Sequence, residues 1–299
     1  HPPPPPPPTP PRLNCRRQRQ MCIRDRWMNL DDNQRRVASK SIPISKKLLK
    51  LAGKTNAEFK LIGEGDKVLV GLSGGKDSLA LVHIMKHIQR HAPFNFEFEA
   101  CTVKYGMPDE HYAFLEAHCK EYDIKHTVYD TNIFEISHDT IRDNSSFCSY
   151  FSRMRRGALY SFAEEGGFTK VALGHHFDDT VESFFMNMFY NGTMRALAPI
   201  YKTSRGFHLI RPLIQARETQ LRAFAEENNL QVIGDEACPA MLKDVKMPHA
   251  RASTKEWLAG LEKENKDIFK MFRASFKHIH DDTFLDPERW NRDDIKDMQ

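Results

Sequence analysis

The stretch from Val68 to Ser78 combines residue types that suit the binding of a phosphate chain. A run of strand character, Val68 to Leu72, leads through Ser73 into two glycines and then into a helical pattern. Backbone N–H groups in such a turn and in the first helical turn point at an anion, and the helix dipole favours negative charge there. The sequence therefore predicts a phosphate site around Gly74 and Gly75.

Side chains of the same stretch add to this chemistry. Ser73 and Ser78 supply hydroxyl donors, and Lys76 supplies a compact positive charge suited to a polyphosphate. Asp77 beside a phosphate site suits either a ligand of Mg²⁺ or a helix cap. The run differs from the common P-loop, because Asp follows the lysine and no glycine lies five positions before Gly75.

A second polar group, Gly174 to Glu182, follows the predicted strand Val171 to Leu173. Its two histidines and two aspartates at a strand end suggest a metal, and with a triphosphate already implied Mg²⁺ is the simplest choice. We predict that Asp178 or Asp179 holds Mg²⁺, and we assign Gly174 and His175 to the nucleotide site. The alternative is that the aspartates cap the helix and that His175 packs or hydrogen-bonds.

A third group joins two cysteines to a basic helix. Cys148 stands where a helix is expected to begin, so the helix dipole and Arg153 would lower the pKa of its thiol. Arg153, Arg155 and Arg156 lie within one helical turn and suit the phosphates of a large polyanion. Cys238 follows a further predicted strand; the alternative for either cysteine is a small buried hydrophobe.

The elements that must position these groups alternate between strands and helices. Crossovers between successive strands imply a mainly parallel sheet with helices on both faces, whose ligands lie at the carboxyl ends of the strands. By that rule the strand end at Cys101 to Lys104 is expected to flank adenine or ribose. The predicted strands are 68–72, 96–103, 125–129, 170–173, 208–211 and 230–233, and the predicted helices are 79–88, 109–122, 149–165, 178–190 and 218–228.

The two ends of the chain differ from this middle part. Residues 1–27 are proline-rich and then basic, and we expect them to be disordered and foreign to the working protein, which would begin at Met28; a basic arm touching RNA is the alternative. Residues 28–60 are predicted to be a basic helical segment, whose lysines form a solvated face or contact tRNA. Residues 61–237 form the predicted ATP-binding α/β domain, residues 238–280 a helical segment and residues 281–299 a flexible tail.

Composition sets broader limits. The 299 residues carry a formal net charge of +4, which is compatible with an RNA partner but weak support alone. Six scattered cysteines do not form the spacing of a secreted disulfide scaffold, so a reducing cytoplasm is expected. No apolar run approaches the roughly 20 residues of a membrane span, and no membrane association is predicted.

The run Ser73-Gly74-Gly75-Lys76-Asp77-Ser78 resembles the signature of the PP-loop ATP-pyrophosphatase superfamily, which splits ATP between its α and β phosphates. A longer series of motifs, from about residue 45 to 255, is similar to the tRNA 2-thiocytidine synthetase (TtcA-like) family. The further motifs are Cys148 with Ser152 to Gly157, Gly174-His175-His176, Asn187 to Gly192 and Ile210 to Leu213.

The resemblance implies a PP-loop α/β fold and an ATP-dependent tRNA sulfurtransferase. It implies that ATP activates the C2 oxygen of cytidine 32 and that sulfur then replaces this oxygen, with Cys148, Cys238 and Asp77 as catalytic residues. It also implies a [4Fe–4S] cluster held by three cysteines and a sulfur donor such as a cysteine desulfurase; a homodimer is one of the assemblies left open.

The chain departs from that family at one position. Phe151 stands where the family has the second cysteine of a Cys-Xaa-Xaa-Cys motif, and phenylalanine cannot bind iron. Three outcomes stay open. The cluster uses a substitute such as Asp235 or a small thiol; or Cys148 and Cys238 carry sulfur as persulfide and disulfide partner without a cluster; or the protein activates another base or nucleophile.

Two other functions compete with this one. Another PP-loop enzyme, such as one that adds an amine to an anticodon base, would need neither Cys148 nor Cys238. A non-catalytic tRNA-binding protein would use ATP only as a ligand, and the presence of Asp77 with Asp178 and Asp179 argues against it.

Overall fold

The computed structural model describes residues 40–133, 147–234, 237, 249–280 and 283–286, without the side chains of residues 147–149 and 249. The described residues from position 41 onward belong to one compact unit. The prediction for residues 1–27 lies outside the described residues. So does most of the predicted tail, because only residues 283–286 of 281–299 are described.

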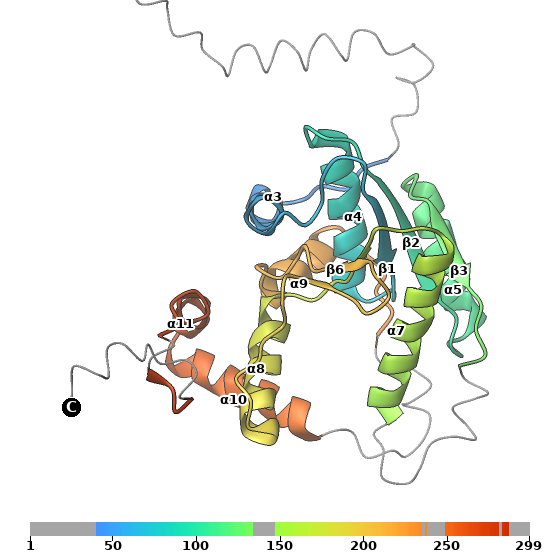
Figure 1. Cartoon of the computed structure of the whole chain (residues 1–299). Helices are drawn as coiled ribbons and strands as arrows, with labels where there is room; N and C mark the ends of the chain where they lie inside the picture. Colours follow the sequence, from blue (N-terminus) through green and yellow to red (C-terminus); the bar gives the residue numbers. More distant parts are fainter. Residues whose placement is uncertain (1–39, 134–146, 235–236, 238–248, 281–282, 287–299) are drawn as a thin grey trace, which may run out of the picture. The chain divides into compact units, whose positions relative to one another are not determined.

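A single six-stranded sheet organises this unit, with the strand order β3-β2-β1-β4-β6-β5 (Figure 1). The neighbours β3, β2, β1, β4 and β6 run parallel, and only the edge strand β5 pairs antiparallel, with β6. This confirms the predicted mainly parallel sheet. The strands are β1 Lys67–Gly71, β2 Glu97–Val103, β3 His126–Tyr129, β4 Lys170–Ala172, β5 Ile200–Lys202 and β6 His208–Ile210.

The central strand β1 is apolar because both of its faces are covered. Val68, Leu69 and Val70 are fully buried, as expected for a parallel strand with helices on either side. Helix α4 (Lys76–His91) packs on β1 and β2, and α7 (Phe147–Glu165) contacts β2 and β4 from the opposite face (Figure 1). The remaining helices of this part are α3 Lys46–Phe59, α5 Asp109–Glu121, α8 Phe177–Asn191 and α9 Glu218–Glu227.

Two further helices, α10 (His249–Glu264) and α11 (Ile268–Ser275), follow the sheet. Helix α10 packs along α8 (Figure 1). A small apolar cluster holds the three helices together, and its buried members are Phe177, Val181, Leu258 and Phe269. The C-terminal helices are thus anchored on the helix that follows β4.

The structure differs from the sequence prediction around α9. Residues 230–233, predicted as a strand, form no strand; instead the Ile233 N–H donates to the Gly74 carbonyl at 3.0 Å. Strand β5 was not predicted, because it has only three residues and two of them, Tyr201 and Lys202, are exposed. Among the described residues, no helix is both long and apolar enough to span a bilayer.

Candidate active site

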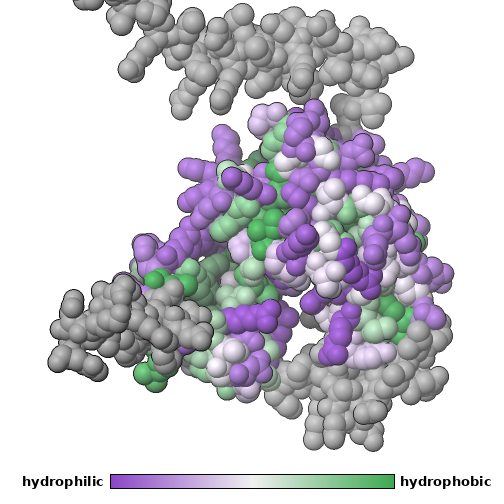
Figure 2. Space-filling model, viewed as in Figure 1, coloured by the Kyte–Doolittle hydropathy of each residue, from purple (hydrophilic) through white to green (hydrophobic). Residues whose placement is uncertain are grey.

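A cleft with a volume of about 420 Å³ opens at the carboxyl ends of β1, β2 and β4. The chain leaves β1 toward β2 on one side and returns to β4 on the other, and parallel sheets bind ligands at such a reversal of strand order. Figure 2 shows that the face seen in Figure 1 is mostly hydrophilic and is hollowed between α7 and α8. The cleft is lined by ends of strands and starts of helices: 71–73, 75, 77–78, 101–103, 105, 107, 152, 155–156, 159, 173–175, 179, 233–234 and 251.

The start of α4 leaves its backbone donors available at this cleft. Gly75 occupies the N-cap position and no side chain caps the helix. The Ser78 hydroxyl instead closes the preceding turn, accepting from the Ser73 N–H at 3.2 Å and donating to the Gly75 carbonyl at 2.9 Å. Uncapped N–H groups beside two hydroxyls and a lysine are an arrangement suited to binding phosphate, so the phosphate site stays a prediction with compatible geometry.

Glycine is required at two positions of this wall. Gly74 has φ +86°, and a Cβ there would lie 2.4 Å from Cδ1 of Ile233. At the end of β4, a Cβ on Gly174 would lie 3.1 Å from the carbonyl carbon and oxygen of Asp77 and 3.2 Å from the backbone nitrogen of Ser78. The two predicted motifs therefore touch through their backbones.

Asp77 brings an unsatisfied carboxylate to the cleft. Its Oδ1 is buried and has no hydrogen-bond partner, while Oδ2 lies 3.3 Å from the Lys76 ammonium. Burial raises the pKa of Asp77 against the opposing charges of His176 and Lys76. The Lys76 ammonium also pairs with Glu218 at 3.1 Å. Burial lowers the pKa of Lys76, but the nearby carboxylates of Asp77 and Glu218 have the larger combined effect, so the pKa is raised.

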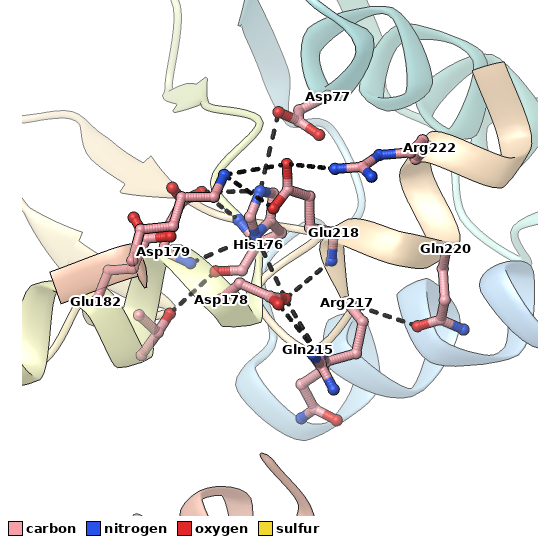
Figure 3. Close-up of polar contacts among 12 residues, drawn as sticks. Asp77, His176, Asp178, Asp179, Glu182, Gln215, Arg217, Glu218, Gln220 and Arg222 are labelled. Carbon is pink, nitrogen blue, oxygen red and sulfur yellow. Dashed lines mark hydrogen bonds and ion pairs between the residues drawn. The ribbon is translucent and has the colours of Figure 1, made fainter. Parts of the chain in front are cut away.

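The start of α8, by contrast, is closed by a capping box. The Asp179 N–H donates to Nδ1 of His176 at 3.4 Å, and the His176 N–H donates to Oδ2 of Asp179 at 3.0 Å. His176 lies between two carboxylates, with Nε2 3.9 Å from Oδ2 of Asp77 and 3.5 Å from Oδ2 of Asp179 (Figure 3). Despite burial, the charges of His176 and Arg251 lower the pKa of Asp179.

The two predicted magnesium ligands differ in their surroundings. Asp178 points away to α9, where both of its oxygens accept from Nε of Arg217 at 3.1 and 3.2 Å, and Oδ2 accepts the Glu218 N–H at 2.8 Å (Figure 3). Asp179 lines the cleft together with Asp77, whereas Asp178 does not. The geometry therefore separates two residues that the sequence could not distinguish.

His175 also lies in the cleft wall, as predicted. Its Nδ1 is buried without a hydrogen-bond partner. Burial lowers the pKa of His175 to about 4, so its ring is neutral at pH 7. A neutral imidazole adds no charge to the nucleotide site but offers a hydrogen-bonding atom there.

The basic helix α7 forms the rim opposite α8. Arg155 and Arg156 line the cleft, and the Arg155 guanidinium lies 4.4 Å from the ring centre of Tyr105. Arg153 is exposed but does not line the cleft. At the predicted strand end, Cys101, Thr102 and Val103 line the cleft and Lys104 does not; their contact with adenine or ribose stays a prediction.

The two cysteines predicted to handle sulfur are described only in part. Cys148 lies in the first turn of α7, but its side chain and the whole of Cys238 lie outside the described residues. Phe151 is 1% exposed and packs into the main core, so it offers no ligand. Cys101 lines the cleft, but burial and Glu99 raise the pKa of its thiol to about 12, which makes it a poor thiolate.

Sequence reasoning missed several residues of the cleft wall. Ile233 and Gly234 line the cleft without the strand that was predicted before them. Tyr105 and Met107 come from the loop after β2, and Arg251 comes from α10. Nothing in the local sequence around Arg251 indicates that it meets Asp179, because the two are 72 positions apart.

The described residues of the cleft include oxygen ligands of a kind suited to a magnesium ion, whereas the side chain of Cys148 and the whole of Cys238 lie outside the described residues. The free oxygen of Asp77 and the neighbouring Asp179 are hard ligands of the kind that hold Mg²⁺ together with substrate phosphates. No group of three or more His, Cys, Asp or Glu side chains converges as a metal site within the described part of the chain.

Comparison with known proteins adds independent information. Residues 43–240 match the family model described as the PP-loop domain. A tRNA-cytidine(32) 2-sulfurtransferase of Syntrophotalea carbinolica is 43% identical over 189 residues, which cover 63% of this chain and 73% of the relative. One from Geobacter metallireducens is 37% identical over 238 residues, covering 79% of this chain and 91% of the relative.

A solved structure supports the fold. The U34-tRNA thiolase NcsA from Methanococcus maripaludis, determined with its [4Fe–4S] cluster, aligns with a TM-score of 0.62. The alignment covers 81% of this chain and 82% of that protein, at 22% sequence identity. With the glycine turn at β1 and the polar run after β4 facing one cleft, the chain belongs to the PP-loop family and, within it, to the tRNA-cytidine(32) 2-sulfurtransferases.

Proposed function

We propose that this protein uses ATP to replace the C2 oxygen of cytidine 32 in tRNA with sulfur. The observation that carries the proposal is the meeting of three features in one cleft. These are the uncapped start of α4, the carboxylates of Asp77 and Asp179, and the arginine-bearing rim of α7. A cleft of about 420 Å³ is in the range of nucleotide and cofactor sites.

In the first step, the C2 oxygen of the cytidine attacks the α-phosphate of ATP and pyrophosphate leaves. The N–H groups at the start of α4, with Lys76 and Ser73, hold the β and γ phosphates, which become the leaving pyrophosphate. Mg²⁺ held by Asp77 and Asp179 would offset the charge that builds on these oxygens. The result is a nucleotide base whose C2 oxygen carries AMP.

In the second step, a sulfur nucleophile attacks C2 and AMP departs with the oxygen, so that a C–O bond is exchanged for a C–S bond. Adenylation makes this exchange feasible, because AMP is a far better leaving group than the original oxygen. We assign the sulfur to Cys148, which would receive it as a persulfide from a donor such as a cysteine desulfurase. After the outer sulfur attacks C2, the Cys238 thiol would break the S–S bond, leaving sulfur on the base and a Cys148–Cys238 disulfide that an external thiol reduces. The reaction is proposed for the cytoplasm, where tRNA is modified.

The tRNA would approach over the α7 rim. Arg153 and Arg156 are exposed there, and Arg155 is held against Tyr105 at the mouth of the cleft. Guanidinium groups spaced along one helix suit neighbouring phosphates of an RNA backbone. Lys46, Lys47 and Lys50 of α3 are exposed as well and form a second candidate contact. A homodimer stays a prediction, which sedimentation analysis would test.

The direct test combines the protein with unmodified tRNA, ATP, Mg²⁺, a cysteine desulfurase with free cysteine as the sulfur donor, and a thiol reductant. Release of AMP and pyrophosphate together with 2-thiocytidine, detected by mass spectrometry of the digested tRNA, is the expected outcome. Nucleotide binding without AMP release would leave only a binding protein. Full modification activity in Cys148→Ser would show that the sulfur does not pass through that thiol.

The fate of the cluster is decided by anaerobic purification with an absorption spectrum and an iron count. A colourless, iron-free protein that still thiolates tRNA would eliminate the cluster and favour the two-thiol route. A brown protein with stoichiometric iron would require a replacement for the ligand that Phe151 cannot supply.

A further inference from the structure

Helix α10 lies beyond the part of the chain that matches the PP-loop family model, residues 43–240, yet it supplies a wall of the cleft. The wall residue is Arg251, close to the start of the helix. Its Nη2 donates to Oδ1 of Asp179 at 2.6 Å, and its Nε donates to Oε2 of Glu182 at 3.1 Å. One guanidinium thus joins two acidic side chains of α8.

Two other contacts tie the same helix to the site. Lys255 pairs with Glu218 at 3.1 Å, and Glu262 accepts from Nη2 of Arg217 at 2.8 Å. Glu218 in turn pairs with Lys76 of the phosphate loop, and Arg217 holds Asp178. Helix α10 therefore reaches both motifs of the cleft through charged side chains.

The charges explain why an arginine is needed at this point. The side chain of Glu182 is 6% exposed, and Asp179 is 15% exposed, so two carboxylates lie close together away from bulk water. Asp77 brings a third carboxylate toward His176 from the other side. Without a cation between them, Asp179 and Glu182 would repel each other, and the Asp179 side chain would turn away from its present position.

We propose that Arg251 is a positioning residue of the ATP site, which holds the Asp179 carboxylate turned toward the cleft so that it can bind Mg²⁺ with the nucleotide. Docking of α10 and binding of Mg–ATP are then coupled, because each depends on the same carboxylate. The inference rests on the proposed function in taking ATP as the nucleotide and Asp179 as a ligand of its Mg²⁺.

The test uses the full chain and the analogue α,β-methylene-ATP, which binds without being split between its α and β phosphates. Affinity is measured calorimetrically with and without Mg²⁺ for wild type, Arg251→Gln and Arg251→Lys. Lys263→Gln is the matched control, because Lys263 is exposed on the same helix and makes no contact with the site among the described residues.

Arg251→Gln is expected to weaken Mg-dependent binding about tenfold or more, the usual effect of losing a charge-assisted contact, while binding in EDTA changes less than about twofold. Lys263→Gln should bind as wild type does. Arg251→Lys keeps the charge but loses the two-pronged geometry, so it should show an intermediate loss. If Arg251→Gln does not fold, the comparison of Arg251→Lys with wild type tests the proposal.

A double-mutant cycle checks that Arg251 acts through Asp179. If it does, Arg251→Gln added to Asp179→Asn should cause no further loss of Mg-dependent affinity. Equal losses with and without Mg²⁺, additive losses in the cycle, or the same loss in Lys263→Gln would overturn the proposal.

The binding assay separates this inference from the proposed function. A wild-type protein that binds the Mg–analogue but releases no AMP from ATP with tRNA would remove the proposed reaction and leave the role of Arg251 standing. An active wild type beside an Arg251→Gln variant with unchanged Mg-dependent binding would remove the inference alone.

Discussion

Helices α4 and α8 begin at the same edge of the sheet, after the neighbouring strands β1 and β4, but their N-termini are finished in opposite ways. Helix α4 has glycine at its N-cap and no side-chain cap, whereas α8 has a capping box made by His176 and Asp179. An open helix start attracts phosphate, and a start closed by carboxylates attracts a cation. The difference supports the proposed division of the site, with phosphates at the start of α4 and Mg²⁺ between Asp77 of α4 and Asp179 of α8.

Closing the open start should have the largest effect. Gly74→Ala would place a side chain at a positive φ, which costs about 1–2 kcal/mol, and would push Cβ against Ile233. The displaced loop should lower ATP-dependent AMP release by about a hundredfold or more, because shifts near 1 Å in a site have effects of that order.

The control for this change is Gly53→Ala on α3, where an added Cβ meets nothing within 4 Å. It should leave activity unchanged and raise stability slightly, since alanine is the better helix former. Adding Ile233→Ala to Gly74→Ala should restore part of the activity. An active Gly74→Ala single variant would mean that the open start of α4 does not hold the phosphates.

Neutralising the carboxylate at the open start should separate activity from stability. Asp77→Asn is expected to lose about a hundredfold in AMP release, because the magnesium loses a ligand at the reacting phosphates. The same change should raise the melting temperature at pH 7, because burial raises the pKa of Asp77 and its charged form is costly in the fold.

The pH dependence gives the sign of this effect. Since the folded-state pKa of Asp77 is raised above the ordinary 3.8, its destabilising contribution grows as pH rises through the folded pKa and vanishes below about pH 3.8, where both states are protonated. The melting-temperature gain of Asp77→Asn should therefore be present at pH 7 and absent in acid. A variant less stable than wild type at pH 7 would contradict the burial argument.

The closed start can be tested by comparing its two aspartates. Asp179→Asn should raise the Mg²⁺ concentration needed for half-maximal AMP release about tenfold, because Asp179 faces the cleft. Asp178→Asn should leave that requirement unchanged but cost about 1–3 kcal/mol of stability, since it weakens the contacts to Arg217 and Glu218. A Mg²⁺ titration of AMP release and urea unfolding of both variants measure the two effects. If Asp178→Asn changed the Mg²⁺ requirement and Asp179→Asn changed only stability, Asp178 would be the magnesium ligand.

The smallest effect is expected from the cap itself. His176→Asn keeps an accepting side chain at the N-cap, so stability and activity should stay close to those of wild type, whereas His176→Ala should lose about 1 kcal/mol. Chemical denaturation measures the stability of the two variants, and AMP release measures their activity. Loss of activity in His176→Asn at unchanged stability would show that the imidazole takes part in the reaction rather than closing the helix.

Much of this contrast could be predicted from sequence, because it depends on residues within a few positions of each other. The glycine turn at Gly74 and Gly75 and the run from Gly174 to Asp179 each follow an apolar strand, and the strand alternation places both at one edge of the sheet. The ambiguity between a metal ligand and a cap could not be resolved, since both use an aspartate in the first helical turn.

The remaining features depend on contacts between distant segments. The run at 230–233 looks like a strand by composition, but the Ile233 N–H pairs with the turn at Gly74 instead of with a sheet neighbour. The contact of Arg251 with Asp179 likewise has no local pattern, because it arises when α10 packs along α8. Short-range periodicity carries no information on either.

The buried ring at position 151 has a bearing on how readily a cysteine could be introduced there. The core has closed around a phenylalanine, so a single step to cysteine would leave a void and cost on the order of 2–4 kcal/mol. Natural domains hold only about 5–15 kcal/mol in reserve. A cysteine at this position would therefore use up a sizeable part of that margin unless neighbouring side chains changed with it to fill the void.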